Sequence, residues 1–205
     1  MAPKDFTELE NMMDFAIKLK SPVVIRYPRG GEAKEKFKTH SYIQLKKCDV
    51  LTLGNDVTIL AIGNQVAKAM SVFRKLKEIN INAEVINARF LKPFDKYTVL
   101  KSISKTRFIV TIEDNTLVSG LGAEVKELIA EKKMQNVTIK SFGYPDVFVE
   151  HGSPDELEKN YKIDEKSIFN YIKGNIKYKK EKNKMKKKGD YKSKEKVLNY
   201  VALKK

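Results

Sequence analysis

The sequence of 205 residues contains one cysteine, no tryptophan and no long apolar run. The single cysteine, Cys48, excludes an internal disulfide, which fits a reducing compartment. No stretch of about 18 apolar residues is present that could cross a bilayer, and the N-terminus lacks the positive region and apolar run of a signal peptide. These absences predict a cytoplasmic protein with no membrane association.

The net charge of +15 is unevenly distributed. Residues 173–205 contain 14 lysines and three acidic residues, a net charge of +11, whereas residues 1–172 hold 27 basic and 23 acidic residues, a net charge of +4. Such a basic segment can bind nucleic acid or anionic surfaces. It lacks the interleaved aromatic residues of a recognisable nucleic-acid module, so a solvated tail without a specific nucleic-acid partner is the favoured interpretation.

Between residues 56 and 143, apolar strands alternate with amphipathic helices. The segment Asp56-Val-Thr-Ile-Leu-Ala-Ile-Gly63 is rich in β-branched residues and predicts a buried strand. Strands separated by helices of about 10–15 residues predict βαβ units, and hence a three-layer α/β/α fold with a mostly parallel sheet. The expected strands are 57–62, 84–87, 108–112 and 137–142, and the expected helices are 66–79, 95–104 and 121–132.

A short apolar run at residues 50–53 precedes the first buried strand. The turn Gly54-Asn-Asp56 between them favours a hairpin, with Asn55 at positive φ. The sheet is therefore expected to carry one antiparallel strand at its edge.

The first 30 residues predict one amphipathic helix and one short strand. Thr7-Glu-Leu-Glu10 has the capping-box pattern, so a helix is expected over residues 8–20, followed by a strand over 23–26. A lone helix and strand cannot form a core. This piece must pack on the later domain, on another chain, or on sequence that is absent.

Two helix starts are predicted near the C-terminus. Ser153-Pro-Asp-Glu156 joins an N-cap serine, a proline at the first helical position and a capping-box glutamate, and Asp164 is expected to cap the last helix. After Gly174 apolar residues become scarce, so residues 174–192 are expected to be disordered and 193–203 at most a marginal helix.

Arginines and acidic residues are the candidates for a site. Arg26 and Arg29 flank a proline turn after the predicted strand, where paired guanidinium groups suit a phosphate, although two surface arginines are the simpler interpretation. Glu113 and Asp114 end a predicted strand, and Gly120-Leu-Gly122 opens the next helix. These acids could act as a general base or metal ligands, but a solvated or capping role is favoured, with helix–strand packing for the glycines.

Other reactive side chains give weaker signals. His40 and His151 have no further ligand at metal-binding spacing, so a zinc site is rejected. Cys48 has no evident activating partner, and a structural thiol is expected.

Several blocks resemble the 1-deoxy-D-xylulose 5-phosphate synthase family. Pro22-Val-Val-Ile-Arg-Tyr-Pro-Arg-Gly30 resembles the end of its pyrimidine-binding domain. Five further segments resemble, in the same order, successive blocks of the family's transketolase-type C-terminal domain. They are residues 56–63, Asn87-Ala-Arg-Phe-Leu-Lys-Pro-Phe-Asp95, Ile112-Glu-Asp-Asn115, residues 120–122 and Gly143-Tyr-Pro-Asp-Val-Phe-Val-Glu-His-Gly152. The implied organisation is a pyrimidine-domain remnant (1–30), a linker (31–49), a transketolase C-terminal-like domain (50–173) and a lysine-rich tail (174–205).

The resemblance implies an enzyme that uses thiamine diphosphate and Mg²⁺. Such an enzyme joins a two-carbon fragment of pyruvate to glyceraldehyde 3-phosphate with loss of CO₂, supplying isoprenoid, thiamine and pyridoxal synthesis. It also implies a five-stranded sheet with one antiparallel strand, a homo-oligomeric full-length protein, and a phosphate-binding role for Arg29, with Arg26 assisting it or bracing the turn.

The departures from the family concern its chemistry. The Gly-Asp-Gly motif for the Mg²⁺-diphosphate is absent from the sequence, and so is the glutamate that activates the cofactor. The chain alone is therefore expected to bind no cofactor and to be inactive, and to need the missing N-terminal domains or a companion chain. The alternatives are a non-enzymatic dimerisation or regulatory module of the same fold, and a binder of nucleic acid or anionic surfaces through the tail.

Overall fold

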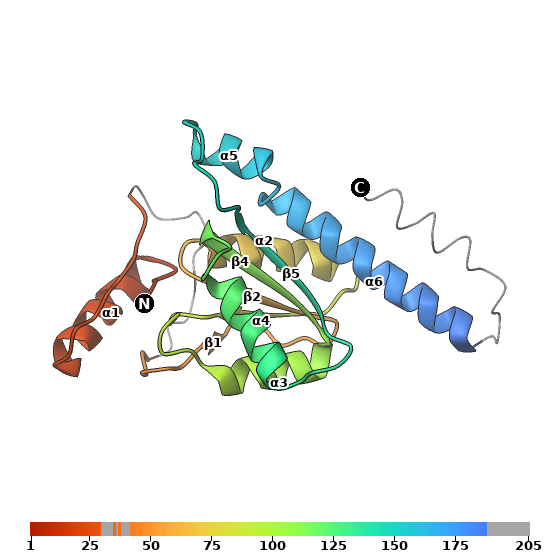
Figure 1. Ribbon diagram of the computed structural model, residues 1–205, viewed down its shortest axis with the longest axis horizontal. Helices are drawn as coiled ribbons and strands as arrows, with labels where there is room; N and C mark the ends of the chain where they lie inside the picture. Colours follow the sequence, from red (N-terminus) through yellow and green to blue (C-terminus); the bar gives the residue numbers. More distant parts are fainter. Residues whose placement is uncertain (30–34, 36, 38–41, 188–205) are drawn as a thin grey trace. The chain divides into compact units, whose positions relative to one another are not determined.

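The computed structural model describes residues 1–29, 35, 37 and 42–187 (Figure 1). The chain divides into two units, residues 1–169 and residues 170–205. The first unit holds the sheet and the elements around it, and the second holds most of the last helix. The predicted linker 31–49 lies partly outside the described residues.

A mixed five-stranded sheet forms the centre of the first unit. Its order is β1-β3-β2-β4-β5, in which β2, β3, β4 and β5 are parallel and β1 is antiparallel to β3. The predicted fold class is confirmed. The strands are β1 (Asp49–Val50), β2 (Val57–Ala61), β3 (Ala83–Asn87), β4 (Phe108–Thr116) and β5 (Thr138–Tyr144).

The predicted hairpin between residues 50–53 and β2 is wrong, because the edge strand pairs with β3 instead. Thr52 fixes this path, since its hydroxyl donates to the carbonyl of Ala83 (3.1 Å) and accepts from the amide of Val85 (2.9 Å). At Gly54 the chain passes so close to β3 that an added Cβ would lie 2.3 Å from the carbonyl carbon of Ala83. Asn55 does not adopt the positive φ that a hairpin turn would need.

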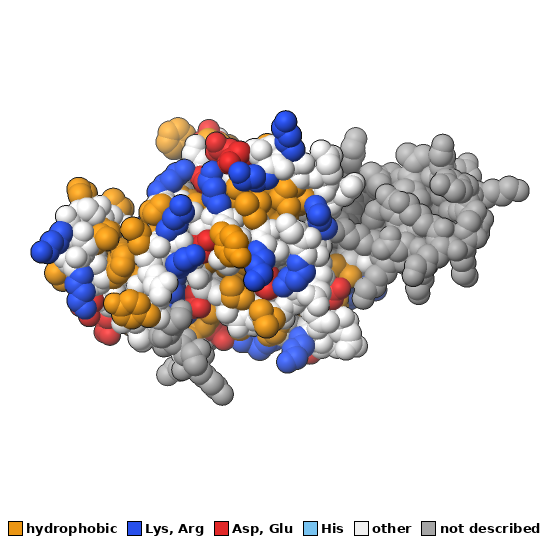
Figure 2. Space-filling model, turned by 90° about the horizontal axis from the view of Figure 1, so that it is seen from below, with side chains coloured by type: hydrophobic (Ala, Val, Ile, Leu, Met, Phe, Trp, Pro, Cys, Tyr) orange, Lys and Arg blue, Asp and Glu red, His pale blue; other side chains and the backbone are white. Residues whose placement is uncertain are grey.

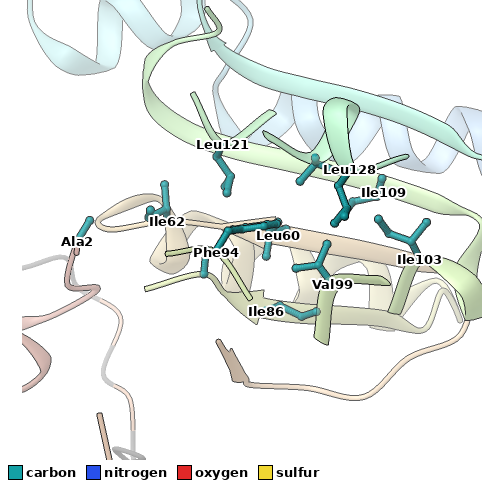
Figure 3. Close-up of a cluster of buried hydrophobic side chains, with 12 residues drawn as sticks. Ala2, Leu60, Ile62, Ile86, Phe94, Val99, Ile103, Ile109, Leu121 and Leu128 are labelled. Carbon is teal, nitrogen blue, oxygen red and sulfur yellow. The ribbon is translucent and has the colours of Figure 1, made fainter. Parts of the chain in front are cut away.

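Helices cover both faces of the sheet, as alternating strand side chains require. The helices are α2 (Gln65–Glu78), α3 (Lys96–Thr106) and α4 (Leu121–Glu131). One face packs against α3 and α4 (Figure 3), through Leu60, Ile86, Ile109, Val99, Ile103, Leu121, Val125 and Leu128. The alternate strand residues point to the opposite face, where α2 buries Val66, Ala69, Val72 and Leu76.

Helix α1 (Phe6–Leu19) begins two residues earlier than predicted. Its N-cap is Asp5, whose carboxylate accepts from the amide of Glu8 (2.7 Å), and not Thr7. The sequence Asp5-Phe-Thr-Glu8 is itself a capping pattern, and Glu8 reaches back to accept from the amide of Lys4 (2.8 Å). This second contact decides between the two possible caps.

The predicted strand at residues 23–26 is also wrong. This extended segment lies beside Met1, whose amino group donates to the carbonyl of Val24 (2.7 Å) and whose carbonyl accepts from the amide of Arg26 (2.9 Å). No sheet ladder forms there. The N-terminal piece therefore adds no strand to the sheet.

Both predicted helix starts near the C-terminus are confirmed. The capping box of Ser153 and Glu156 opens α5 (Pro154–Asn160), and Asp164 accepts from the amide of Ser167 (3.1 Å) at the start of α6 (Glu165–Lys187). Helix α6 continues past Gly174, so the expected disorder is wrong for residues 174–187. Buried Ile172 and Ile176 extend its apolar spacing beyond that glycine, and lysine favours helix.

Residues 188–205, where disorder and a marginal helix were predicted, lie outside the described residues. In the described part of the chain, no helix is both long and apolar enough to span a membrane.

Candidate functional site

The N-terminal piece lies against the carboxyl ends of β2 and β4, the edge where open α/β sheets bind ligands. Arg26 makes the contact, because its Nη1 donates to the carbonyl of Asp114 at 2.8 Å. The Asp114 carboxylate in turn accepts from the side-chain amide of Asn64 at 3.1 Å. Arg26 is thereby held at the sheet edge although it is 88 residues from its partner.

A small polar pocket of about 70 Å³ opens beside this contact. It lies at the start of α2, a helix with no acidic residue in its first turn. Its lining combines Arg26, Ala2, Tyr27 and Pro28 of the N-terminal piece with Gly63, Asn64 and the acidic Asp114 of the strand ends. A guanidinium at a helix N-terminus is an arrangement that suits an anion.

Arg29 occupies a different position from Arg26. Its side chain is exposed, and it does not line the pocket. The next residue of the turn, Gly30, lies outside the described residues. The structure therefore brings Arg26 to the strand ends and leaves Arg29 exposed outside the pocket lining, and the phosphate role of both stays a prediction.

A larger cavity of about 640 Å³ separates α1 and residues 21–24 from the strand ends. Its wall is mostly apolar and includes Phe15, Leu19, Val23, Phe90 and Leu121. The polar groups that reach it are Arg26, Lys92, Glu113 and Asn115.

Glu113 is buried and caps α4. Its carboxylate accepts from the amides of Leu121 (2.8 Å) and Gly122 (2.9 Å), so of the two predicted roles the capping one is confirmed and the solvated one is wrong for this residue. Burial raises the pKa of Glu113 above its ordinary value, although these two bonds and the charge of Arg26 act in the opposite direction. The carboxylate is engaged with the helix and is not presented as a base.

The glycines of Gly120-Leu-Gly122 serve packing, as predicted. An added Cβ at Gly120 would lie 2.1 Å from Oε2 of Glu113, and one at Gly122 would lie 2.3 Å from Oγ of Ser141. Only glycine allows α4 to approach the strands this closely.

A buried ionic network, which the sequence did not reveal, joins α1 to the carboxyl end of β3. Glu8 is 1% exposed and Arg89 is 2% exposed, and Nε of Arg89 donates to Glu8 at 2.7 Å. The Glu8 carboxylate also accepts twice from Asn87 (3.0 Å each), and Arg89 donates to Asp49 (3.1 Å). These contacts hold α1 on the sheet edge. Glu8 and Arg89 are 81 residues apart, so spacing gives no signal for the pair.

The described residues contain no group of three or more histidines, cysteines or carboxylates that could hold a metal ion. His151 is exposed. His40 lies outside the described residues. The described donor set thus does not fit a Mg²⁺-diphosphate group.

Cys48 lies near the same network and donates to the carbonyl of Ala88 (3.6 Å). Burial, followed by the charge of Asp95, raises the pKa of its thiol to about 12. At pH 8 the thiolate is therefore about 1,000-fold scarcer than at an unshifted pKa near 9.

We expect iodoacetamide to label Cys48 at pH 8 at least about 100-fold more slowly in the folded chain than in urea, because only the thiolate reacts. The folded rate should rise about tenfold per pH unit above pH 8. Mass spectrometry of the alkylated chain measures both rates, with the urea sample as control. Equal rates in the two states would contradict the buried, protonated thiol.

Comparison with known families places most of the first unit in one of them. The family described as "Transketolase, C-terminal domain" matches residues 46–168. The match begins just before β1 and ends within the first turn of α6.

Curated relatives of the chain are 1-deoxy-D-xylulose-5-phosphate synthases. The protein from Halothermothrix orenii is 40% identical over 170 residues, which is 82% of this chain and 27% of the relative. The protein from Clostridium tetani is 38% identical over 172 residues, 84% of this chain and 28% of the relative. The chain spans about a quarter of the length of these relatives.

A solved structure has a similar fold over most of the chain. It is described as a split gene transketolase, inactive beta4 tetramer, and it superposes with a TM-score of 0.77 at 28% identity, covering 86% of this chain and 57% of that one.

Proposed function

Because this chain belongs to the transketolase C-terminal domain family, we propose that it is the C-terminal portion of a 1-deoxy-D-xylulose 5-phosphate synthase. Such an enzyme condenses pyruvate with glyceraldehyde 3-phosphate and releases CO₂. The observation that carries the proposal is 35–41% identity to synthases of this name over about four fifths of the chain. A cytoplasmic location is part of the proposal, since the one cysteine cannot form an internal disulfide.

The cofactor would be held by polypeptide that this chain does not supply. Thiamine diphosphate, when bound with Mg²⁺, provides the carbanion chemistry of the reaction. The described residues lack a carboxylate cluster for the metal, and the chain covers only about 27% of its relatives. The solved relative described as a split gene transketolase supports a division of such an enzyme between two chains. We propose that a companion chain completes the site, and that the full assembly is a homo-oligomer of such units.

This chain would contribute cations for the triose phosphate. Arg26 is fixed by the carbonyl of Asp114, so its guanidinium is preorganised beside the polar pocket. Arg29 is exposed and directly follows Pro28, which lines the pocket, so its side chain can reach a phosphate from the solvent side. Paired arginines grip phosphate oxygens with charged hydrogen bonds.

Reconstitution tests the proposal. The companion is the Halothermothrix orenii synthase lacking the quarter that matches this chain, and the readout is CO₂ release from pyruvate that depends on glyceraldehyde 3-phosphate. We expect no activity from either piece and activity from the mixture. Absence of product from every mixture would refute the enzymatic assignment and favour the non-enzymatic module.

In the active mixture, Arg29→Ala should raise KM for glyceraldehyde 3-phosphate about 10–100-fold, because a charged hydrogen bond contributes about 1.5–3 kcal/mol. The KM for pyruvate should change little, since pyruvate carries no phosphate. Lys18→Ala, which removes a cation from the outer side of α1, is the control and should leave both constants unchanged. An unaltered triose KM in Arg29→Ala would remove Arg29 from the phosphate site.

A further inference from the structure

Helix α1 is apolar around most of its circumference. At about 100° per residue, its apolar side chains span an arc of about 200°. The polar side is a stripe formed by Thr7, Glu10, Asn11, Asp14 and Lys18, in which Glu10 borders the apolar arc. A helix with a single buried face needs an apolar stripe of only about 100°.

The first unit covers one side of this arc. Met12 is fully buried, and Phe15 meets Phe90 edge-on with ring centroids 6.2 Å apart. On the same inner side, Phe15 and Leu19 line the cavity of about 640 Å³. The inner packing of α1 is therefore incomplete in the isolated chain.

The other side of the arc is open to solvent. Phe6 is 52% exposed, Met13 53% and Ile17 77%, and these three residues follow one another at i, i+7 and i+11. Figure 2 shows hydrophobic side chains on the surface at the left, the end of the molecule where Figure 1 places α1. Val24 and Tyr27, in the segment that follows α1, are exposed as well. We call Phe6, Met13 and Ile17 the outer ridge of α1.

The outer ridge indicates a second body packed on α1. Scattered exposed apolar residues need no explanation, but a continuous exposed apolar row on one side of a helix is typical of a protein interface. The three ridge residues are uncharged, and the exposed charge of the helix that borders them is the carboxylate of Glu10, so this surface does not favour an anionic partner.

We propose that the outer ridge docks the companion chain, which presents an apolar face to Phe6, Met13 and Ile17. This inference rests on the proposed function, and it identifies where the missing part of the enzyme attaches. The curated relatives are almost four times as long as the matched region, so a large body is available to cover the ridge.

A second copy of this chain fits the ridge less well. Helix α1 has 14 residues and is therefore about 21 Å long. Three side chains on such a helix offer much less than the roughly 800 Å² per partner of a stable interface. A companion can extend its contact to Val24, Tyr27 and the cavity mouth.

Binding to the companion tests the ridge. The probe is the Halothermothrix orenii synthase without its matching quarter, and Kd is measured by sedimentation. The double variant Met13→Glu/Ile17→Glu places two charges in the ridge, and we expect it to raise Kd at least about 100-fold. The matched control, Thr7→Glu/Asn11→Glu, adds the same charge to the polar stripe and should stay within about twofold of the unmodified chain.

The ridge is exposed, so the circular dichroism spectrum and unfolding midpoint of both variants should match those of the unmodified chain. Docking through the ridge is refuted if the unmodified chain does not bind, or if the ridge variant binds equally well. A homodimer that the ridge variant dissociates would assign the ridge to a second copy instead. A ridge-dependent complex without product would refute only the proposed function, and an active mixture unaffected by the ridge variant would refute only the docking.

Discussion

Replacing Arg89 by alanine is expected to lower the free energy of unfolding by about 3–5 kcal/mol, the range for breaking one side of a buried ion pair. Glu8 is 1% exposed and receives its strongest hydrogen bond from Arg89 at 2.7 Å. Without the guanidinium, its carboxylate keeps only the neutral amide donors of Asn87 and the backbone of Lys4, with the Lys4 ammonium 3.8 Å away. An under-compensated buried charge is costly. Urea unfolding followed by circular dichroism measures the loss.

The exposed ion pair between Arg74 and Glu35 provides a matched control. Both guanidinium nitrogens of Arg74 contact the Glu35 carboxylate, one at 2.9 Å, but half of the arginine side chain is exposed. Arg74→Ala should therefore cost less than about 1 kcal/mol. Similar losses for the two variants would mean that the Glu8–Arg89 pair is hydrated and does not hold α1 on the sheet edge.

The double variant Glu8→Met/Arg89→Met separates charge from packing. Buried ion pairs can often be replaced by apolar residues of similar volume at little cost. We expect this variant to be more stable than Arg89→Ala, since the fully buried Glu8 carboxylate is removed together with its partner, and the carboxylate that loses its ion pair to Arg89 is the less buried Asp49, 14% exposed. If it is instead the least stable of the set, the pair contributes chiefly through its many hydrogen bonds.

The alternation of β2, α2, β3, α3, β4, α4 and β5 could be predicted because it is local. Each buried strand is a short β-branched run, and each helix shows its own apolar spacing. The capping of α5 by Ser153 and of α6 by Asp164 was equally predictable, since the cap side chain and the backbone amide that donates to it are three residues apart.

The predictions of the edge-strand pairing and of the α1 cap were wrong because contacts with residues distant in the sequence determine both. The run at 50–53 could pair with either neighbour in the sheet, and the contacts of Thr52 with Ala83 and Val85 select β3. The cap of α1 could be Asp5 or Thr7 from spacing alone. In the folded chain Glu8 is also held by Arg89, which favours the register that starts at Asp5.

For the same reason, the sequence predicted individual residues of the candidate site but not the contacts between them. Arg26, Glu113 and Gly120 stood out as residue types at strand or helix ends. Their partners did not, because the contact from Arg26 to Asp114 spans 88 residues. The cavity under α1 depends on the packing of separate segments, which no local pattern encodes.

Replacing Gly120 by alanine is expected to lower the free energy of unfolding by about 3–5 kcal/mol, because overpacking and the loss of charged hydrogen bonds act together. The new Cβ would lie 2.1 Å from Oε2 of Glu113 and 2.7 Å from the carbonyl oxygen of Thr116. Glu113 must then leave the amides of Leu121 and Gly122, which uncaps α4. Urea unfolding gives the stability, and hydrogen exchange at the start of α4 reports the lost cap.

Gly152→Ala is the matched control, since its added Cβ would come closest to the side chain of Leu157, at 3.2 Å, and would lie 3.9 Å from Oε2 of Glu156. That side chain can shift, so a change within about 1 kcal/mol is expected. A double-mutant cycle that combines Gly120→Ala with Glu113→Ala then shows whether Glu113 is the group with which the new Cβ clashes. Removing the carboxylate first should make the second substitution cheaper by about 0.5–3 kcal/mol, the usual coupling of residues in contact. Strict additivity of the two losses would show that the Thr116 carbonyl, and not Glu113, requires glycine at position 120.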